Sequence, residues 1–217
     1  NIYATGYVSR RGGPSEVLIF KFTSNGTLEF NTTWNMFSDA WGQDIYVDSY
    51  GYIYVVGNAS EQYNVTVDNE TKVYTTYLTI LIKYYQENYQ FHKPFGNITK
   101  EATAITEDTI GATSVLLSGP LIYVAGFVKN KRTGKDIILL RYTTRGEFQW
   151  NETFTGNATH PASGDEVAYS MHISEGGFIY IVGETTSYQQ AGEGKNIIVL
   201  KYELPTIVAV SYTHLTL

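Results

Sequence analysis

The chain has 217 residues, of which 15% are aromatic and 17% charged, with a formal net charge of −6 at pH 7 and no cysteine. The acidic balance argues against nucleic acid as a partner, because a phosphate backbone attracts a basic surface. The absence of cysteine excludes disulfide bonds and thiolate metal sites. The apolar runs have the length of strands and are too short to span a bilayer.

One short motif recurs along the chain and defines its organisation. It consists of Ile-Tyr, two further residues and Gly, and it stands at Ile2–Gly6, Ile53–Gly57, Ile122–Gly126 and Ile179–Gly183. Self-similarity at this spacing indicates a repeat architecture. The many Tyr, Thr and Val residues suit half-buried strands, so the repeating unit is predicted to be built from β-strands.

The motifs have the same companions in the same order. An apolar run that ends in a basic–aromatic pair comes next, at Val17–Phe22, Leu78–Tyr84, Ile137–Tyr142 and Ile197–Tyr202. A turn such as Ser24-Asn25-Gly26 leads to an aromatic-rich strand, because Asn-Gly tolerates the positive φ of tight turns. These aromatic strands are expected at 28–34, 89–95 and 147–154, and a further strand precedes each later motif, at 40–48, 110–117 and 166–173.

Each repeat is therefore predicted to contain four short strands, which is the size of a β-propeller blade. The blades are expected at about 1–34, 40–95, 109–154 and 165–203, with the middle two whole and the outer two partial. The expected fold is an all-β propeller fragment of four-stranded antiparallel blades, and a β-sandwich or β-solenoid is the alternative. The polar stretch between Gly57 and Thr75 is expected to be an inserted loop.

The order of these residues resembles the SBBP type of seven-bladed β-propeller repeat. The similarity is greatest from Asp39-Ala40 through Asp48 and Gly51 to Ile53–Gly57, and it covers about residues 1–203. The resemblance implies a bacterial or archaeal protein that is extracellular or bound to the cell surface, without assigned catalysis.

The end of the chain departs from the repeat. After Lys201-Tyr202 a polar hairpin is expected, but residues 204–217 resemble the translation of sequencing-adapter DNA. We therefore expect a fragment of a longer repeat protein, with a single repeat array over 1–203 and an artefactual tail. A genuine C-terminal strand over Ile207–Val210 is the alternative interpretation.

Asn-x-Ser/Thr sequences are dense in this chain. Such sites accept N-glycans on exposed segments of secreted proteins. The candidate glycosylation sites are Asn31, Asn58, Asn64, Asn69, Asn97, Asn151 and Asn157, while Asn25 also matches but serves its hairpin turn. Their number favours an exported glycoprotein, although chance in a chain rich in Asn and Thr is an alternative.

Acidic residues cluster where the first strand of each blade is expected to begin. They are Asp39, Asp44, Glu107, Asp108, Asp165 and Glu166. Because the first strand of a blade lines the propeller channel, these carboxylates would ring its mouth. They would there bind Ca²⁺ or act as the acid/base pair of a glycoside hydrolase or lyase. The interpretation that we favour is structural: each carboxylate caps a loop or accepts backbone N–H bonds between blades.

The sequence therefore favours a non-catalytic binding, adhesion or scaffold module over a propeller enzyme. No cofactor, catalytic residue or metal ligand is assigned, and Ca²⁺ is the one ion that the acidic positions suggest. The expected partner is a protein or glycan at the cell surface. The basic residues that close the apolar runs, and the tyrosines of the repeated motif, are interpreted as packing residues; they are Lys21, Lys83, Arg141, Lys201, Tyr3, Tyr54, Tyr123 and Tyr180.

Overall fold

The computed structural model describes residues 1–67, 69–95, 110–130, 133–156, 164–187 and 194–203. All of its regular structure is β-strand, as the composition predicts. The chain divides into two compact units, Asn1–Ala112 and Thr113–Leu217. In the described ranges there is no helix of the length and apolarity needed to cross a membrane.

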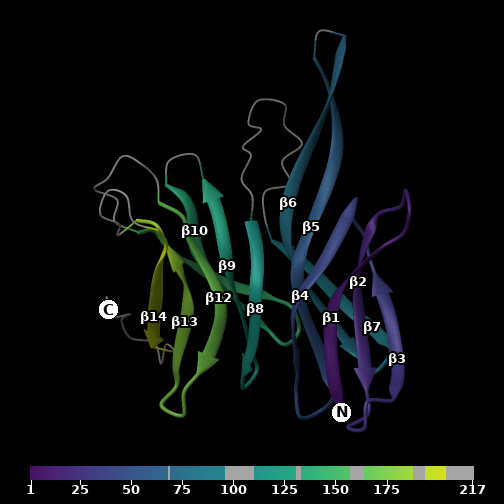
Figure 1. The fold of residues 1–217 in the computed structure, drawn as a ribbon, viewed down its shortest axis with the longest axis vertical. Coiled ribbons are helices and arrows are strands. Elements are labelled where there is room, and N and C mark those ends of the chain that lie inside the picture. The colour runs from purple at the N-terminus through teal and green to yellow at the C-terminus, as the bar shows by residue number, and fades with distance from the viewer. Residues whose placement is uncertain (68, 96–109, 131–132, 157–163, 188–193, 204–217) are drawn as a thin grey trace. The chain divides into compact units, whose positions relative to one another are not determined.

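Fourteen described strands form four antiparallel sheets, which Figure 1 labels in chain order. The first sheet contains β1 (Ile2–Ser9), β2 (Ser15–Phe22) and β3 (Leu28–Trp34), and the second contains β4 (Asp39–Val47), β5 (Tyr52–Val67), β6 (Glu70–Tyr85) and β7 (Asn88–Phe95). The third contains β8 (Ile110–Ser118), β9 (Leu121–Asn130), β10 (Gly134–Thr143) and β11 (Phe148–Phe154), and the fourth contains β12 (Glu166–Ile173), β13 (Phe178–Thr185) and β14 (Asn196–Glu203).

Every sheet is a meander in which consecutive strands are neighbours. This is the strand order of a propeller blade, and the predicted division into two four-stranded and two three-stranded sheets is confirmed. The repeated glycines give the four sheets a common register. Each one pairs with an apolar residue of the following strand, in the pairs Gly6–Leu18, Gly57–Ile80, Gly126–Ile138 and Gly183–Ile198.

The predicted hairpin turns are present, with one difference in their backbone. At Thr23–Thr27 the N–H of Gly26 donates to Thr23 O at 3.0 Å, and the N–H of Thr23 donates to Thr27 O at 2.9 Å. Gly26 has a φ of +85°, whereas Asn25 is not among the residues with positive φ. The turn is therefore a three-residue hairpin loop closed by one left-handed glycine, and Asn-Gly does not act as a two-residue turn.

Apolar packing between successive sheets forms the core of each unit. In the first unit, Val17 and Ile19 of β2 and Trp34 of β3 belong to one buried cluster with Ile53 and Val55 of β5. In the second unit, the third and fourth sheets are in contact through β9, β10 and β12. In β2 the buried residues alternate, whereas Ile137–Leu140 of β10 are all buried. Because the two faces of a strand receive alternate side chains, β10 presents apolar side chains to both faces of its sheet.

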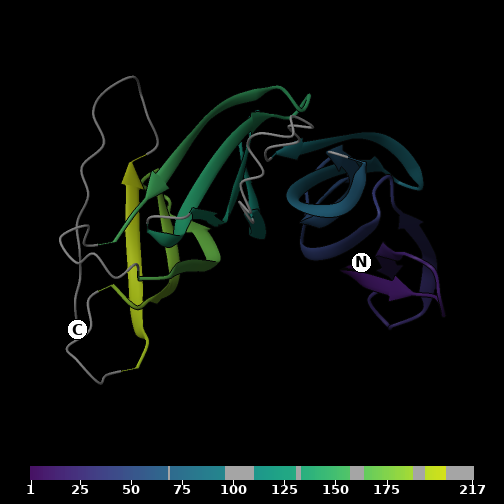
Figure 2. The ribbon, with the colours of Figure 1, turned by 90° about the horizontal axis from the view of Figure 1, so that it is seen from above.

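The stretch between Gly57 and Thr75 is not the expected loop. It extends β5 and β6, which pair without interruption from Tyr52–Tyr85 to Val67–Glu70. The neighbouring strands end earlier, since β4 pairs only as far as Ser60 and β7 only as far as Thr79. Residues 61–77 therefore belong to a two-stranded extension, called the arm below, which rises above the sheet in Figure 1 and points toward the viewer in Figure 2.

Candidate functional site

The carboxylate of Asp39 connects the second sheet to the first. Its Oδ1 accepts a hydrogen bond of 2.7 Å from the backbone N–H of Ser15, at the start of β2. Its Oδ2 lies 3.5 Å from the hydroxyl of Ser60, the residue that pairs with Asp39 across the β4–β5 ladder. Ser15 is only 9% exposed, so the carboxylate satisfies an amide donor that has little access to water.

Asp165 has the same role in the second unit. Its Oδ1 accepts a hydrogen bond of 2.9 Å from the backbone N–H of Lys135, on β10. Lys135 and Ser15 occupy the same position relative to the repeated glycine of their sheets. We call these two Asp-to-amide bonds the aspartate clamps. They agree with the structural interpretation, in which the carboxylates accept N–H bonds between sheets.

Glu166 is the most enclosed of the candidate acids, with no exposed surface. Its Oε1 accepts hydrogen bonds from the Thr185 hydroxyl, at 2.8 Å, and from the Ser187 hydroxyl. Its Oε2 accepts the backbone N–H of Gly156 at 3.1 Å. These three hydrogen-bond donors offset the free-energy cost of burying a carboxylate. Because the donors belong to the end of β13 and to the segment after β11, Glu166 connects these two parts of the chain.

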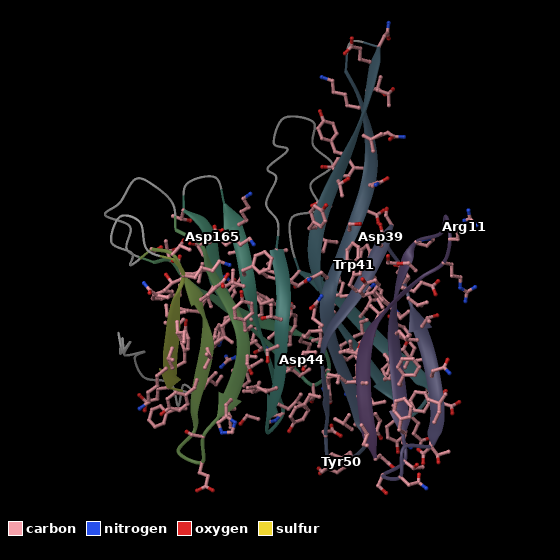
Figure 3. The ribbon with its side chains drawn as sticks, in the orientation of Figure 1. Arg11, Asp39, Trp41, Asp44, Tyr50 and Asp165 are labelled. Atoms are coloured by element: carbon pink, nitrogen blue, oxygen red, sulfur yellow. The ribbon has the colours of Figure 1, made fainter. Side chains whose placement is uncertain are left out.

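Asp44, the other candidate acid among the described residues, lies apart from Asp39. Asp44 is half-buried, its Oδ1 accepts the N–H of Ile45 at 2.9 Å, and Figure 3 shows it well separated from Asp39 along β4. Glu107 and Asp108 lie outside the described residues. Within the described ranges, no group of three or more His, Asp or Glu side chains is placed to hold a metal ion. Binding of Ca²⁺ therefore stays a prediction from the sequence.

Three of the four basic residues that close the apolar runs pack against aromatic rings, whereas Lys21 forms an ion pair with Glu29 at 2.5 Å. The Lys83 ammonium lies 4.1 Å from the ring centroid of Tyr52 and 5.1 Å from that of Tyr54. Burial lowers the pKa of Lys83 and raises the pKa of Tyr54, whose hydroxyl donates to Asp48 Oδ2 at 3.3 Å. Arg141 over Trp150 and Lys201 over Phe178 repeat this cation–π contact, at 4.9 and 3.8 Å.

The arm presents side chains that no neighbouring strand covers. Tyr63 and Tyr74 are cross-strand partners whose rings stack at 6.0 Å between centroids. Val73 and Tyr77 are large, apolar and exposed. Near the tip the hydroxyls of Thr66 and Thr71 are hydrogen-bonded at 2.9 Å. The arm thus combines paired aromatic rings with hydroxyl groups on a projecting two-stranded ribbon.

The structure sorts the candidate glycosylation sites by exposure and by hydrogen bonding. Four of them have exposed side chains: Asn31 on β3, Asn151 on β11, and Asn64 and Asn69 on the arm. Asn58 is half-buried and its Oδ1 accepts the N–H of Ala112 at 2.8 Å, while Asn25 Oδ1 accepts the N–H of Thr27 at 3.3 Å within its turn. Asn97 and Asn157 lie outside the described residues.

No protein-family model and no curated protein matches this sequence.

The arm is what sequence reasoning missed, whereas N–H bonds from the carboxylates to a neighbouring sheet were expected but their partner residues were not. The signal for the arm was present, because β-formers alternate with polar residues on both sides of Asp68-Asn69. Asn69 adopts a φ of +64°, a left-handed conformation that Asn tolerates better than other non-glycine residues. The pairing of Asp39 with Ser15 carried no local signal, since the two residues are joined only when the sheets pack.

Proposed function

We propose that this chain is a non-catalytic binding or scaffold module of an exported or cell-surface protein, built as part of a β-propeller. The observation that supports it best is the use made of the acidic residues. Asp39, Asp165 and Glu166 direct their oxygens at backbone amides and hydroxyls of the same chain. A glycosidase would instead need two carboxylates facing one substrate space.

The arm is the element that we assign to recognition. Tyrosine supplies a large contact area with only two side-chain torsions to immobilise, which makes it effective at binding surfaces. The stacked Tyr63 and Tyr74 and the exposed Tyr77 lie on a ribbon beside which the structure describes no further strand. A surface glycan or protein is the partner class that this aromatic and hydroxyl-rich ribbon suits.

Export is supported by the four exposed sequons. Asn31 and Asn151 occupy equivalent positions, because each follows the aromatic residue that pairs with the basic residue of its sheet. Asn64 and Asn69 lie where an attached glycan displaces no packed side chain. This distribution fits a protein that is folded in a glycosylating secretory route.

A glycan array tests the binding role. We expect the intact chain to bind a subset of immobilised glycans, and Tyr63→Ser/Tyr74→Ser to lose that binding at least tenfold with its melting temperature nearly unchanged. Thr75→Ser, on the other face of the arm, is the matched control and should bind like the parent. Release of sugar from the bound glycans, abolished by Glu166→Gln in a variant that still folds, would overturn the proposal in favour of a propeller enzyme.

A further inference from the structure

Arg10 and Arg11 lie in the turn between β1 and β2, and both side chains are exposed. Among the described residues neither guanidinium has a carboxylate partner. The basic residues that close the apolar runs are used inside the protein, because they pair with Glu29 or lie over aromatic rings. Two adjacent exposed cations on a chain of net charge −6 therefore favour an anionic ligand at this turn.

The turn that carries these arginines is closed by hydrogen bonds. The N–H of Gly13 donates to Arg10 O at 2.9 Å. At the base of the turn, Ser9 and Ser15 are cross-strand partners whose hydroxyls are hydrogen-bonded at 2.7 Å. These bonds fix the backbone of the turn before a ligand arrives, which lowers the entropy cost of binding.

This turn and the arm rise from one junction, which is the aspartate clamp of the first unit. Asp39 accepts the N–H of Ser15, the residue that follows the turn. Its other carboxylate oxygen lies 3.5 Å from the hydroxyl of Ser60, the residue that precedes the arm. The turn and the arm therefore project from the same end of the first unit, where Figure 3 labels Arg11 and Asp39.

The aromatic pair of the arm lies on the face of the second sheet that the first sheet covers. Ala59 of β5 belongs to the buried cluster that β2 completes. Alternate residues of a strand share a face, so Tyr63 lies on the face of Ala59, and Tyr74 joins it there as its cross-strand partner. The exposed Lys72, two residues before Tyr74, is on this face as well. The ring pair thus lies on the side of the arm where the β1–β2 turn stands.

We propose that the arm and the β1–β2 turn together bind an acidic glycan, a sugar chain that carries carboxylate or sulfate groups. Tyr63 and Tyr74 pack against a sugar ring, for which tyrosine offers a large contact area. Arg10 and Arg11 bind the anionic substituent, because the planar guanidinium makes charge-assisted, bidentate hydrogen bonds to such groups. This inference rests on the proposed function and narrows its partner from glycans in general to acidic ones.

The charges of the arm itself make the arginines the deciding groups. Glu61 and Glu70 lie on the face of Tyr63, as the alternation of the two strands shows. With Lys72 as the cation of this face, the arm alone has no net attraction for an anion. A preference for acidic sugars must then come from Arg10 and Arg11. Glu61→Gln removes a repulsive charge and should strengthen that preference.

The N-glycans that we expect on this unit leave the proposed surface open. Asn64 follows Tyr63 directly and so projects from the opposite face of the arm. Asn69 stands in the turn at the tip of the arm. Asn31 pairs with Phe20, which points away from the face of β2 that the second sheet covers. A chain from a bacterial host, without N-glycans, therefore serves for the measurement.

Isothermal titration calorimetry of the full chain tests the inference with two pairs of probes. One pair is a hexamer of galacturonic acid and its methyl ester, and the other is a sulfated galactan hexamer and its unsulfated counterpart. We expect an acidic probe to bind at least tenfold more tightly than its neutral counterpart, with a difference that shrinks as salt rises. The pair that shows the difference identifies the carboxylate or the sulfate as the group bound.

Arg10→Gln/Arg11→Gln should abolish the difference between acidic and neutral probes and leave the weaker neutral binding in place. Arg145→Gln, at the exposed arginine of the β10–β11 turn, is the matched control and should bind like the parent. Circular dichroism verifies that both variants fold.

The inference is overturned if neither acidic probe binds more tightly than its neutral counterpart, or if the double arginine variant keeps the difference. An equal loss in Arg145→Gln also overturns it, because the effect would then follow from net charge alone. The glycan array separates this failure from that of the proposed function. An array that retains neutral glycans only overturns the acidic preference, whereas an array that retains no glycan overturns both.

Discussion

Gly57 lies so close to Trp41 across the β4–β5 pair that a side chain at Gly57 would meet the Trp41 backbone. A Cβ at Gly57 would come within 1.9 Å of the Trp41 carbonyl oxygen. Gly183 has the same relationship to Val167, at 2.1 Å, in the fourth sheet. In both ladders the register shifts just after this point, between Gly42 and Asp44 and between Ala168 and Ser170. The repeated glycine therefore accommodates a bulge in the first strand of the sheet.

We expect Gly57→Ala to lower the free energy of unfolding by about 3 kcal/mol, because the backbone oxygen cannot move without breaking the ladder. Urea denaturation followed by circular dichroism measures the change. Gly6→Ala is the control that the chain itself offers. Gly6 belongs to the same motif, but among the described strands β1 pairs only with β2, and nothing lies within 4 Å of the Cβ position of Gly6. Equal losses in the two variants would show that the bulge is not the reason for the glycine.

Removing an aspartate clamp is expected to lower the free energy of unfolding, because the clamp joins two neighbouring sheets. Asp39→Ala leaves the buried N–H of Ser15 without its acceptor, and we expect a loss of about 2 kcal/mol in stability. Asp39→Asn keeps one acceptor oxygen and should lose less. Hydrogen exchange of the Ser15 amide gives a local measurement, with faster exchange expected in Asp39→Ala than in Asp39→Asn. If exchange at Ser15 is unchanged in both variants, the clamp does not protect this amide.

His92 predicts a dependence of stability on pH in the first unit. Its ring lies 5.1 Å from that of Trp34 and 6.3 Å from that of Phe37, and Tyr89 Oη is hydrogen-bonded to its Nδ1. Burial, aided by the charge of Lys93, lowers the pKa of His92. The folded state therefore binds this proton less readily than the unfolded state does. The contribution of neutral His92 to stability is fully present above the pKa that His92 has in the unfolded chain, about 6.5. It is lost as the pH falls through the lower pKa that His92 has in the folded protein.

Urea midpoints measured between about pH 8 and pH 5 check this expectation. His92→Phe keeps the aromatic packing and should flatten the profile over that window. A parent-like slope in His92→Phe would assign the titration to another group.

The repeat itself explains why the strands and turns could be predicted from the sequence. Strand alternation and turn residues are local, so the four sheets and the turn at Gly26 follow from short segments. The function of Asp39 could not be decided locally, because its partner Ser15 belongs to another sheet. For the same reason the sequence left open whether the acids form one ring, and the structure gives Asp39, Asp165 and Glu166 separate protein partners.

The arm shows a different limit of prediction from the sequence, namely that composition does not separate a polar loop from a polar ribbon. Residues 58–75 are polar and carry three sequons, so composition pointed to a loop. Polar β-formers in alternation satisfy a two-stranded ribbon equally well, and the cross-strand Tyr63–Tyr74 pair stabilises this one. The two-residue alternation of β-forming residues predicts this segment better than its polarity does, because an exposed two-stranded ribbon needs no apolar face.

If the protein is exported as proposed, the exposure of each Asn-x-Ser/Thr site predicts whether it carries a glycan. When the chain is secreted from a glycosylating host, we expect glycans at Asn31, Asn64, Asn69 and Asn151 in the folded product. Asn58 should be unmodified, because a glycan on its amide nitrogen must share the half-buried space where its oxygen accepts the N–H of Ala112.

Mass spectrometry of glycopeptides from the secreted, folded fraction measures each site. Asn58→Gln should not alter the glycan count, whereas Asn69→Gln should lower it by one. High occupancy at Asn58 in folded protein would contradict the sorting by exposure, and an unmodified but secreted chain would remove the support that the sequons give to export.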